Sequence, residues 1–371
     1  MIKDWKQDSL LPSIKETLAS AQSLKLGKPV KITVKPEDSQ ACSHQKLENG
    51  QTFKCVDFYK QPAFRNSSPG LQVVSNLAIL QDQKSVSGLG LGSRGCPIGT
   101  VPILELSNQH VVYPKGLEPH AGSRYQAKQH CSAKVQTVFN ANKKFFGVAG
   151  AITIYKPNVP SNQWSSSRIK LLNGGDSIEA GWMVNPSKFN DNNAHLYASF
   201  SGNGRGCINL DCPGFVQVAT DIPLGLSPNS YSTFDRQILW ALSIDKHQDD
   251  GNWWLSITSS KKAIGYWPKS LFSSLQDVAN QVEFGGEIHN PNAVEPPTPM
   301  GNGFKAAYDT TVSSCFFRAT VVDETNTNVN PPDTEKFADC PDLYSVLDGG
   351  HQKDPNLGRL IFYGGPNGPL S

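Results

Sequence analysis

The sequence has no run of about eighteen apolar residues, so it predicts no membrane-spanning helix. It also has no excess of one charge, because 34 Lys and Arg stand against 32 Asp and Glu and leave a net charge of +2. Such a balance does not supply the basic field that drives nucleic-acid binding. The opening residues, MIKDWKQDSL, lack the continuous apolar stretch of a signal peptide. We therefore expect neither a nucleic-acid partner nor a membrane partner.

Several common catalytic motifs are absent as well. The chain contains no Walker sequence, no HExxH and no GxSxG, and its eight His residues are scattered without the spacing of metal ligands. Gly90, Gly92 and Gly95 formally match a dinucleotide fingerprint, but polar residues precede them and Cys96-Pro97 follows. That motif needs a buried strand before it and a helix after it. We interpret the glycines as a loop, and we expect no cofactor and no metal.

The composition favours short strands over helices. The 371 residues include 32 Gly and 26 Pro, which interrupt helices, while 7 Trp, 10 Tyr and 17 Phe can fill a core. One helix is expected over residues 271–282, where apolar residues recur at helical spacing. The fold class predicted is mostly β, an antiparallel sandwich. Strands are expected over 150–157, 177–184, 195–200, 214–218, 237–244, 253–257 and 316–322.

Charge and aromatic content divide the chain into two parts. Residues 1–132 carry 16 basic and 10 acidic residues (+6), whereas residues 133–371 carry 18 and 22 (−4). Six of the seven Trp lie after position 160. The first part predicts a small α+β unit, and the second part predicts the sandwich. Within the first part we expect a helix over 14–24, a strand around 32–34, a proline-interrupted edge strand over 101–104 and an exposed linker over 113–129.

The eight cysteines are even in number and form no CxxC motif. This usage is typical of disulfides in an oxidising compartment, although buried free thiols in a cytosolic protein also fit. Cys207 and Cys212 enclose four residues between two expected strands, and we predict that they form a disulfide that holds the rim of a cleft. A reactive thiol pair or a metal clip is the alternative for this pair.

Two glutamates lie beside glycines on expected strands. Glu179 faces away from the apolar Ile178, Ala180 and Trp182, and Gly181 leaves room next to it. Glu287 likewise lies opposite an apolar strand face formed by positions 282, 284 and 288, directly after two glycines. The same alternation fits solvated strand residues, and pattern alone does not bring the two glutamates together.

At these positions the chain resembles the neprosin family of plant glutamic endopeptidases. The matching segments follow one another in order over about residues 47–366, and a chance match in that order is very improbable. They are CVDFYKQPAF (55–64), CPIGTVP (96–102), IEAGW (178–182), GCINLDC (206–212), GFVQ (214–217), GNWW (251–254), GYWP (265–268), FGGE (284–287) and YGGP (363–366).

The resemblance implies an activation propeptide over 1–130 and a jelly-roll-like β-sandwich peptidase over 131–371. It further implies a secreted or vacuolar zymogen, inhibited by its own propeptide, that cleaves protein or peptide substrates after proline in acid. The segments that carry the family's catalytic pair correspond to Glu179 and Glu287. Glu283 corresponds to a variable position and is not included in the pair.

The resemblance also bears on the cysteines. The matched propeptide segments imply a bond between Cys55 and Cys96. Family members end with a further cysteine that pairs with the equivalent of Cys340, but this chain stops without it. Cys340 is therefore expected to find another partner, for which Cys315 is one candidate, or to stay free. Cys42 and Cys131 are additional to the family pattern, and a bond between them would tie the end of the propeptide to its beginning.

Two carboxylates in one cleft suggest a mechanism. At about 5 Å and an effective dielectric of about 20, their repulsion is roughly 3 kcal/mol, which keeps one protonated in mild acid while the other is ionised. The ionised carboxylate activates a water and the protonated one acts as the acid, but the sequence does not assign these roles. Trp182, Trp253, Trp254 and Trp267 could form walls for a proline ring or pack in the core. Two alternatives remain: a secreted β-sandwich that binds without catalysis, and a glycoside hydrolase that uses the same carboxylates.

Overall fold

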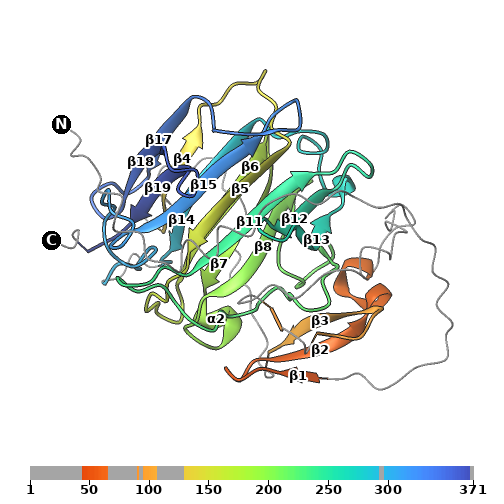
Figure 1. The fold of residues 1–371 in the computed structure, drawn as a ribbon. Helices are drawn as coiled ribbons and strands as arrows, with labels where there is room; N and C mark the ends of the chain where they lie inside the picture. The colour runs from red at the N-terminus through yellow and green to blue at the C-terminus, as the bar shows by residue number, and fades with distance from the viewer. Residues whose placement is uncertain (1–43, 66–89, 92–94, 107–128, 292–295, 368–371) are drawn as a thin grey trace.

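The computed structural model describes residues 44–65, 90–91, 95–106, 129–291 and 296–367 (Figure 1). The helix expected over 14–24, the strand around 32–34, nearly all of the linker and Cys42 lie outside these residues. The described strands form three sheets in which every strand pair that joins two named strands is antiparallel. The prediction of a mostly β, antiparallel fold is therefore confirmed.

The sheet that matters most for the site has seven strands, in the order β17-β4-β14-β6-β7-β8-β9. One of its faces is apolar, since Ile169, Ile178, Trp182 and Phe284 are buried against the second large sheet. Strand β4 begins at His130. The seven strands are β17 (Thr334–Ala338), β4 (His130–Thr137), β14 (Gln281–His289), β6 (Trp164–Asn173), β7 (Asp176–Val184), β8 (His195–Gly202) and β9 (Arg205–Ile208).

The second large sheet covers that apolar face and completes the sandwich (Figure 1). The two layers are also joined by a hydrogen bond, in which the Trp182 indole donates to the carbonyl of Thr153 at 2.9 Å. Eight of its strands follow the order β10-β13-β12-β11-β5-β15-β19-β18, and the ninth, β16, pairs with β15. They are β10 (Val216–Gln217), β13 (Lys262–Trp267), β12 (Trp253–Ile257), β11 (Leu239–Lys246), β5 (Gly147–Thr153), β15 (Ser314–Val322), β19 (Arg359–Gly364), β18 (Ser345–His351) and β16 (Asn328–Val329).

Helices are short throughout the described residues, and none is long and apolar enough to cross a bilayer. The helix expected over 271–282 is wrong. Only the 3-10 helix η6 (Lys269–Leu271) forms there, and β14 begins at Gln281. The carboxylate of Asp176 accepts the backbone N–H groups of Ser273, Ser274 and Leu275, which fixes this segment as a loop. Its buried apolar residues gave the helical spacing. The other helices are η2 (Phe58–Lys60), η3 (Pro62–Phe64) and α2 (Pro186–Phe189).

The third sheet belongs to the N-terminal part and has three strands in the order β1-β2-β3. They are β1 (His44–Lys46), β2 (Thr52–Asp57) and β3 (Thr100–Glu105). The expected edge strand over 101–104 is confirmed as β3, whose Pro102 lies at the edge of the sheet. This small sheet packs beside the sandwich through Phe58, Ala63 and Val101, which share a buried cluster with Val216, Val218, Trp254 and Tyr266 (Figure 1).

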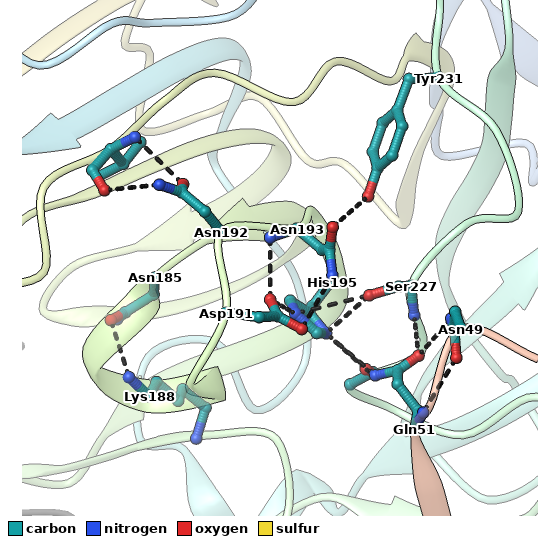
Figure 2. A network of polar contacts seen from close by, with 12 residues as sticks. Asn49, Gln51, Asn185, Lys188, Asp191, Asn192, Asn193, His195, Ser227 and Tyr231 are labelled. Atoms are coloured by element: carbon teal, nitrogen blue, oxygen red, sulfur yellow. Dashed lines mark hydrogen bonds and ion pairs between the residues drawn. The ribbon is translucent and has the colours of Figure 1, made fainter. Parts of the chain in front are cut away.

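Two glutamines of the N-terminal part make hydrogen bonds to the sandwich. The fully buried Gln61 donates to the carbonyl of Gln217 at 3.2 Å and accepts its N–H at 2.8 Å. Gln51 donates to the carbonyl of Gly225 at 2.8 Å and accepts the N–H of Ser227 at 2.8 Å, beside the buried His195 (Figure 2). The contacts of Gln61 join neutral amides, whereas Gln51 Nε2 also lies 3.3 Å from Nδ1 of His195.

Three disulfides lie within the described residues. Cys207 is bonded to Cys212 and Cys55 to Cys96, as expected. Cys340 has found another partner, because it is bonded to Cys131, and the suggested bonds Cys315–Cys340 and Cys42–Cys131 are therefore wrong. Strands β4 and β17 pair up to Ala133 and Ala338, which brings the two Cα atoms to 5.7 Å. Cys315 is a buried free thiol.

The disulfide pattern gives the first testable prediction. Peptide mapping without reductant should recover the peptide of Cys131 joined to that of Cys340. The Cys315 thiol should react with an alkylating reagent only after unfolding, because it is buried and burial raises its pKa well above the usual value. A Cys131 peptide joined to Cys42 would contradict this pairing.

Candidate active site

The candidate site lies on the outer face of the seven-stranded sheet, opposite the core. On β6, Ile169 and Leu171 point into the core, so Arg168 and Lys170 point outward. Lys170 lies opposite Glu179 of β7 on one side and opposite Glu283 of β14 on the other. Outward-facing residues of β6, β7 and β14 thus form one charged surface.

Arg168 is the centre of this surface. Its Nε donates to Glu179 at 3.0 Å, while its Nη2 donates to Glu287 at 2.8 Å and to Glu283 at 3.2 Å. The side chain of Arg168 is only 3% exposed, and those of Glu283, Glu179 and Glu287 are 4%, 14% and 24% exposed. The two predicted glutamates, which lie on strands separated by β6, therefore meet through one guanidinium.

The partners of the three carboxylates differ. Glu179 has a second cation, because Lys170 Nζ lies 3.1 Å from it, and it accepts a hydrogen bond from the Tyr197 hydroxyl at 3.2 Å. Glu283 has Lys134 of β4 as its second cation, at 2.5 Å. Arg168 is the cation paired with Glu287. Glu287 is thus both the most exposed of the three and the one with the fewest described ionic partners.

Glycines on both neighbouring strands flank Arg168. Gly181 of β7 and Gly285 of β14 lie directly opposite it in the sheet. A Cβ at Gly181 would lie 1.8 Å from the carbonyl oxygen of Ser167, and one at Gly285 would lie 2.3 Å from that of Ala133. Only glycine fits this close approach of the strands, and no side chain from either position covers the guanidinium.

The charges and the burial of the site lower the pKa values of two of its glutamates and raise that of its tyrosine. Burial would raise the pKa of Glu179, but Lys170 and Arg168 outweigh it, and the pKa lies below its usual value. Burial likewise opposes ionisation of Glu283, yet Lys134, Arg168 and Lys170 lower its pKa to about 2. The pKa of Tyr197 is raised well above its usual value by burial and by Glu179, so its hydroxyl keeps its proton and donates.

Sequence reasoning placed Glu179 and Glu287 on outward faces, and the structure brings both to the same surface. It missed Arg168, Lys170 and Lys134, and it left out Glu283. The alternation of β6 around Ile169 and Leu171 carried a signal for the first two. The repulsion expected between two bare carboxylates is offset by the cation between them, which is a correction to the expected electrostatics.

The four tryptophans and Cys207, which the sequence also singled out, are not part of the charged network. Trp182, Trp253, Trp254 and Trp267 are each at most 2% exposed, so they pack in the core and form no wall of the site. Cys207 lies on β9, at the edge of the seven-stranded sheet, and is opposite Phe200 of β8. The described residues contain no group of three His, Cys, Asp or Glu side chains that could hold a metal ion.

Comparisons with known proteins bear on this surface. A family model described as Neprosin matches residues 161–366, which is more than half of the chain and includes β6, β7 and β14. Scytalidoglutamic peptidase with a peptide-based transition-state analogue is similar at 9% identity and a TM-score of 0.36, over 63% of this chain and 97% of that one. SCP-B, a member of the eqolisin family of peptidases in complex with the tripeptide Ala-Ile-His, matches at 9% identity and 0.34 over the same shares. A β-porphyranase from the human gut bacterium Bacteroides plebeius gives 8% identity and 0.22, over 64% and 76%. These scores identify no activity for this chain.

The charged surface predicts a pH-dependent stability. Glu283 has a folded pKa of about 2 against a usual value of 4.5, so the unfolded chain binds more protons between these values. The stabilisation from Glu283 should be complete above about pH 4.5 and should be lost as the pH falls through about 2, with a size of up to about 3 kcal/mol. Urea unfolding at a series of pH values measures it.

The difference between the wild type and Glu283→Gln isolates this contribution. Glu335→Gln removes the same charge from an exposed position on β17 and should keep the wild-type slope. A wild-type slope no steeper than that of Glu283→Gln would show that the carboxylate is not held ionised by its neighbours.

Proposed function

Because this chain belongs to the neprosin family, we propose that it is an acid glutamic endopeptidase whose catalytic residues are Glu179 and Glu287. The observation that carries the proposal is the contact of both carboxylates with one buried guanidinium, on a face with no neighbouring side chain at Gly181 or Gly285. Such a pair can supply both a base and an acid to one peptide bond.

The unequal surroundings of the two glutamates support a division of roles. Glu179 has two cations and a tyrosine hydroxyl, and its lowered pKa keeps it ionised in mild acid. We therefore assign Glu179 as the general base. Glu287 is more exposed and is paired with Arg168 alone in the described network, so we assign it as the general acid.

The proposed reaction needs one water. Glu179 takes a proton from this water as its oxygen attacks the scissile carbonyl carbon. Protonated Glu287 first polarises the carbonyl oxygen through a hydrogen bond. It then gives its proton to the leaving nitrogen. When the C–N bond breaks, the products are a new carboxyl group and a new amine, and proton exchange with solvent restores the two glutamates.

Finer features of the proposal extend beyond the site. We propose that cleavage favours proline, that the protein is secreted or vacuolar, and that its first part, about residues 1–130, is an inhibitory propeptide. Three disulfides are consistent with an extracellular protein. The small N-terminal sheet reaches the outer face, because Leu104 packs against a cluster that contains Met183 and Tyr197, and Tyr197 bonds Glu179.

The dyad predicts the effect of two conservative substitutions. Glu179→Gln and Glu287→Gln should each lower kcat by about a thousandfold or more, because each removes a proton transfer that the pair supplies. The assay is cleavage of proline-containing peptides, mass-mapped over a range of acid pH. The wild-type profile should be bell-shaped, since one carboxylate must be charged and the other neutral. Near-wild-type turnover by either variant would remove that glutamate from the mechanism.

The same preparations test the alternative functions. Release of sugars from cell-wall glycans without peptide cleavage would support a glycoside hydrolase. Tight binding of a glycan or protein without turnover would support a non-catalytic sandwich. Both outcomes would contradict the peptidase proposal.

The zymogen proposal predicts an acid-induced cut in the linker expected over residues 113–129. Cys55–Cys96 lies wholly before this segment and Cys131–Cys340 wholly after it, so neither bond joins the two fragments. The fragments should therefore separate on a gel without reductant. The opposite charges of the two parts, +6 and −4 about residue 132, should favour their association near neutral pH and weaken it as carboxylates are protonated.

The measurement is an acid time course with N-terminal sequencing of the larger fragment. Glu287→Gln should stay uncut if the chain processes itself. A full-length wild-type chain that is active at neutral pH and stays uncut in acid would contradict the zymogen proposal.

A further inference from the structure

Glu283 is a third carboxylate at the candidate site, and the proposed mechanism does not use it. It lies on β14 four residues before Glu287, on the same outward face and with Gly285 between them. Its side chain is 4% exposed, so a substrate has little access to it. A buried carboxylate at this depth is costly unless cations surround it, and here two do.

The contacts of Glu283 act on the guanidinium that joins the candidate dyad. One oxygen of Glu283 accepts from Arg168 Nη2 at 3.2 Å, and the other accepts from Lys134 Nζ. The same Nη2 donates to Glu287, while Nε donates to Glu179. Because the guanidinium is planar, three carboxylates around these two nitrogens fix both its position and its plane.

We propose that Glu283 is a positioning residue, which acts through Arg168 to hold Glu179 and Glu287 in their working geometry. This inference rests on the proposed peptidase function. Without Glu283, no second carboxylate competes for Nη2 of Arg168, so the guanidinium is drawn towards Glu287 and its plane is no longer fixed. Its charge then acts on the dyad uncompensated.

Other charged and titratable groups face this network from each packed strand. The same outward face carries Lys170 of β6, Lys134 and His130 of β4, Tyr197 of β8, His289 of β14 and Glu335 of β17. Asp339 approaches from beyond β17, where it accepts hydrogen bonds from Ser132 opposite Glu287. Glu283 is distinct among the acidic groups because it shares one nitrogen of Arg168 with Glu287.

The experiment compares pH–rate profiles of the wild type and Glu283→Gln. Loss of the negative charge makes Arg168 favour ionised Glu287, so the proton required on Glu287 is lost at a lower pH. We expect the alkaline limb of kcat to move down by about one pH unit, and kcat at the optimum to fall between about tenfold and a hundredfold with little change in KM.

Two further variants separate positioning from a general structural effect. Glu283→Asp keeps the charge, so its alkaline limb should stay near the wild-type position even where kcat falls. It also serves as the test variant if Glu283→Gln does not fold, in which case an unchanged kcat in Glu283→Asp overturns the proposal. Glu324→Gln makes the same charge change at an exposed position in the turn between β15 and β16 of the other large sheet, and it should leave the profile unchanged.

A crystal structure of Glu283→Gln supplies a readout that is independent of activity. We expect the guanidinium of Arg168 to turn towards Glu287 and to lose its contact with Glu179. An Arg168 that keeps both contacts overturns the proposal, whether or not the protein cleaves peptides. A wild type without acid peptidase activity contradicts the proposed function instead, and the crystal structure still decides the role of Glu283.

Discussion

The burial of Arg168 among three carboxylates is the constraint on which the outer face depends. A guanidinium that is 3% exposed has lost its water, and Glu179, Glu283 and Glu287 replace that water at Nε and Nη2 with charge-assisted hydrogen bonds. Each of these groups is costly to bury alone, so the network is stable only when all are present together. The network also requires a fixed register of β7 and β14 against β6. The apolar residues on the opposite face of these strands stabilise that register, because they pack in the core.

The same charges affect both the stability of the fold and the proposed chemistry of the site. Lys170 and Tyr197 hold Glu179 ionised, while Glu287 lies at the better exposed end with Arg168 alone as its described ionic partner. The surroundings of the two carboxylates are therefore unequal. In a pair of interacting carboxylates, unequal surroundings decide which of the two stays ionised.

Much of the fold and part of the site could be predicted from the sequence. Apolar and polar residues alternate along β7 and β14, and this predicted that Glu179 and Glu287 face away from the core, because successive side chains of a strand point to opposite faces. The segment 271–282 misled, since apolar residues in a packed loop can imitate helical spacing until Asp176 is seen to bind its backbone. The pairing of Cys131 with Cys340 depends on the adjacency of β4 and β17, which no local pattern contains. The role of Arg168 could not be predicted for the same reason. It contacts Glu179 and Glu287 because β7 and β14 lie on either side of β6 in the sheet, and β14 is far from β6 in the chain.

The buried Gln61 has a consequence for solubility. Its amide occupies the outward hydrogen-bonding groups of Gln217, on the strand β10 that ends the nine-stranded sheet. An uncovered sheet edge of this kind is a template on which another chain can add a strand and begin to aggregate. The N-terminal part therefore shields this edge of the sandwich against unwanted association. Because β10 has only two residues, the edge is short, and a short edge gives an incoming strand few groups to pair with.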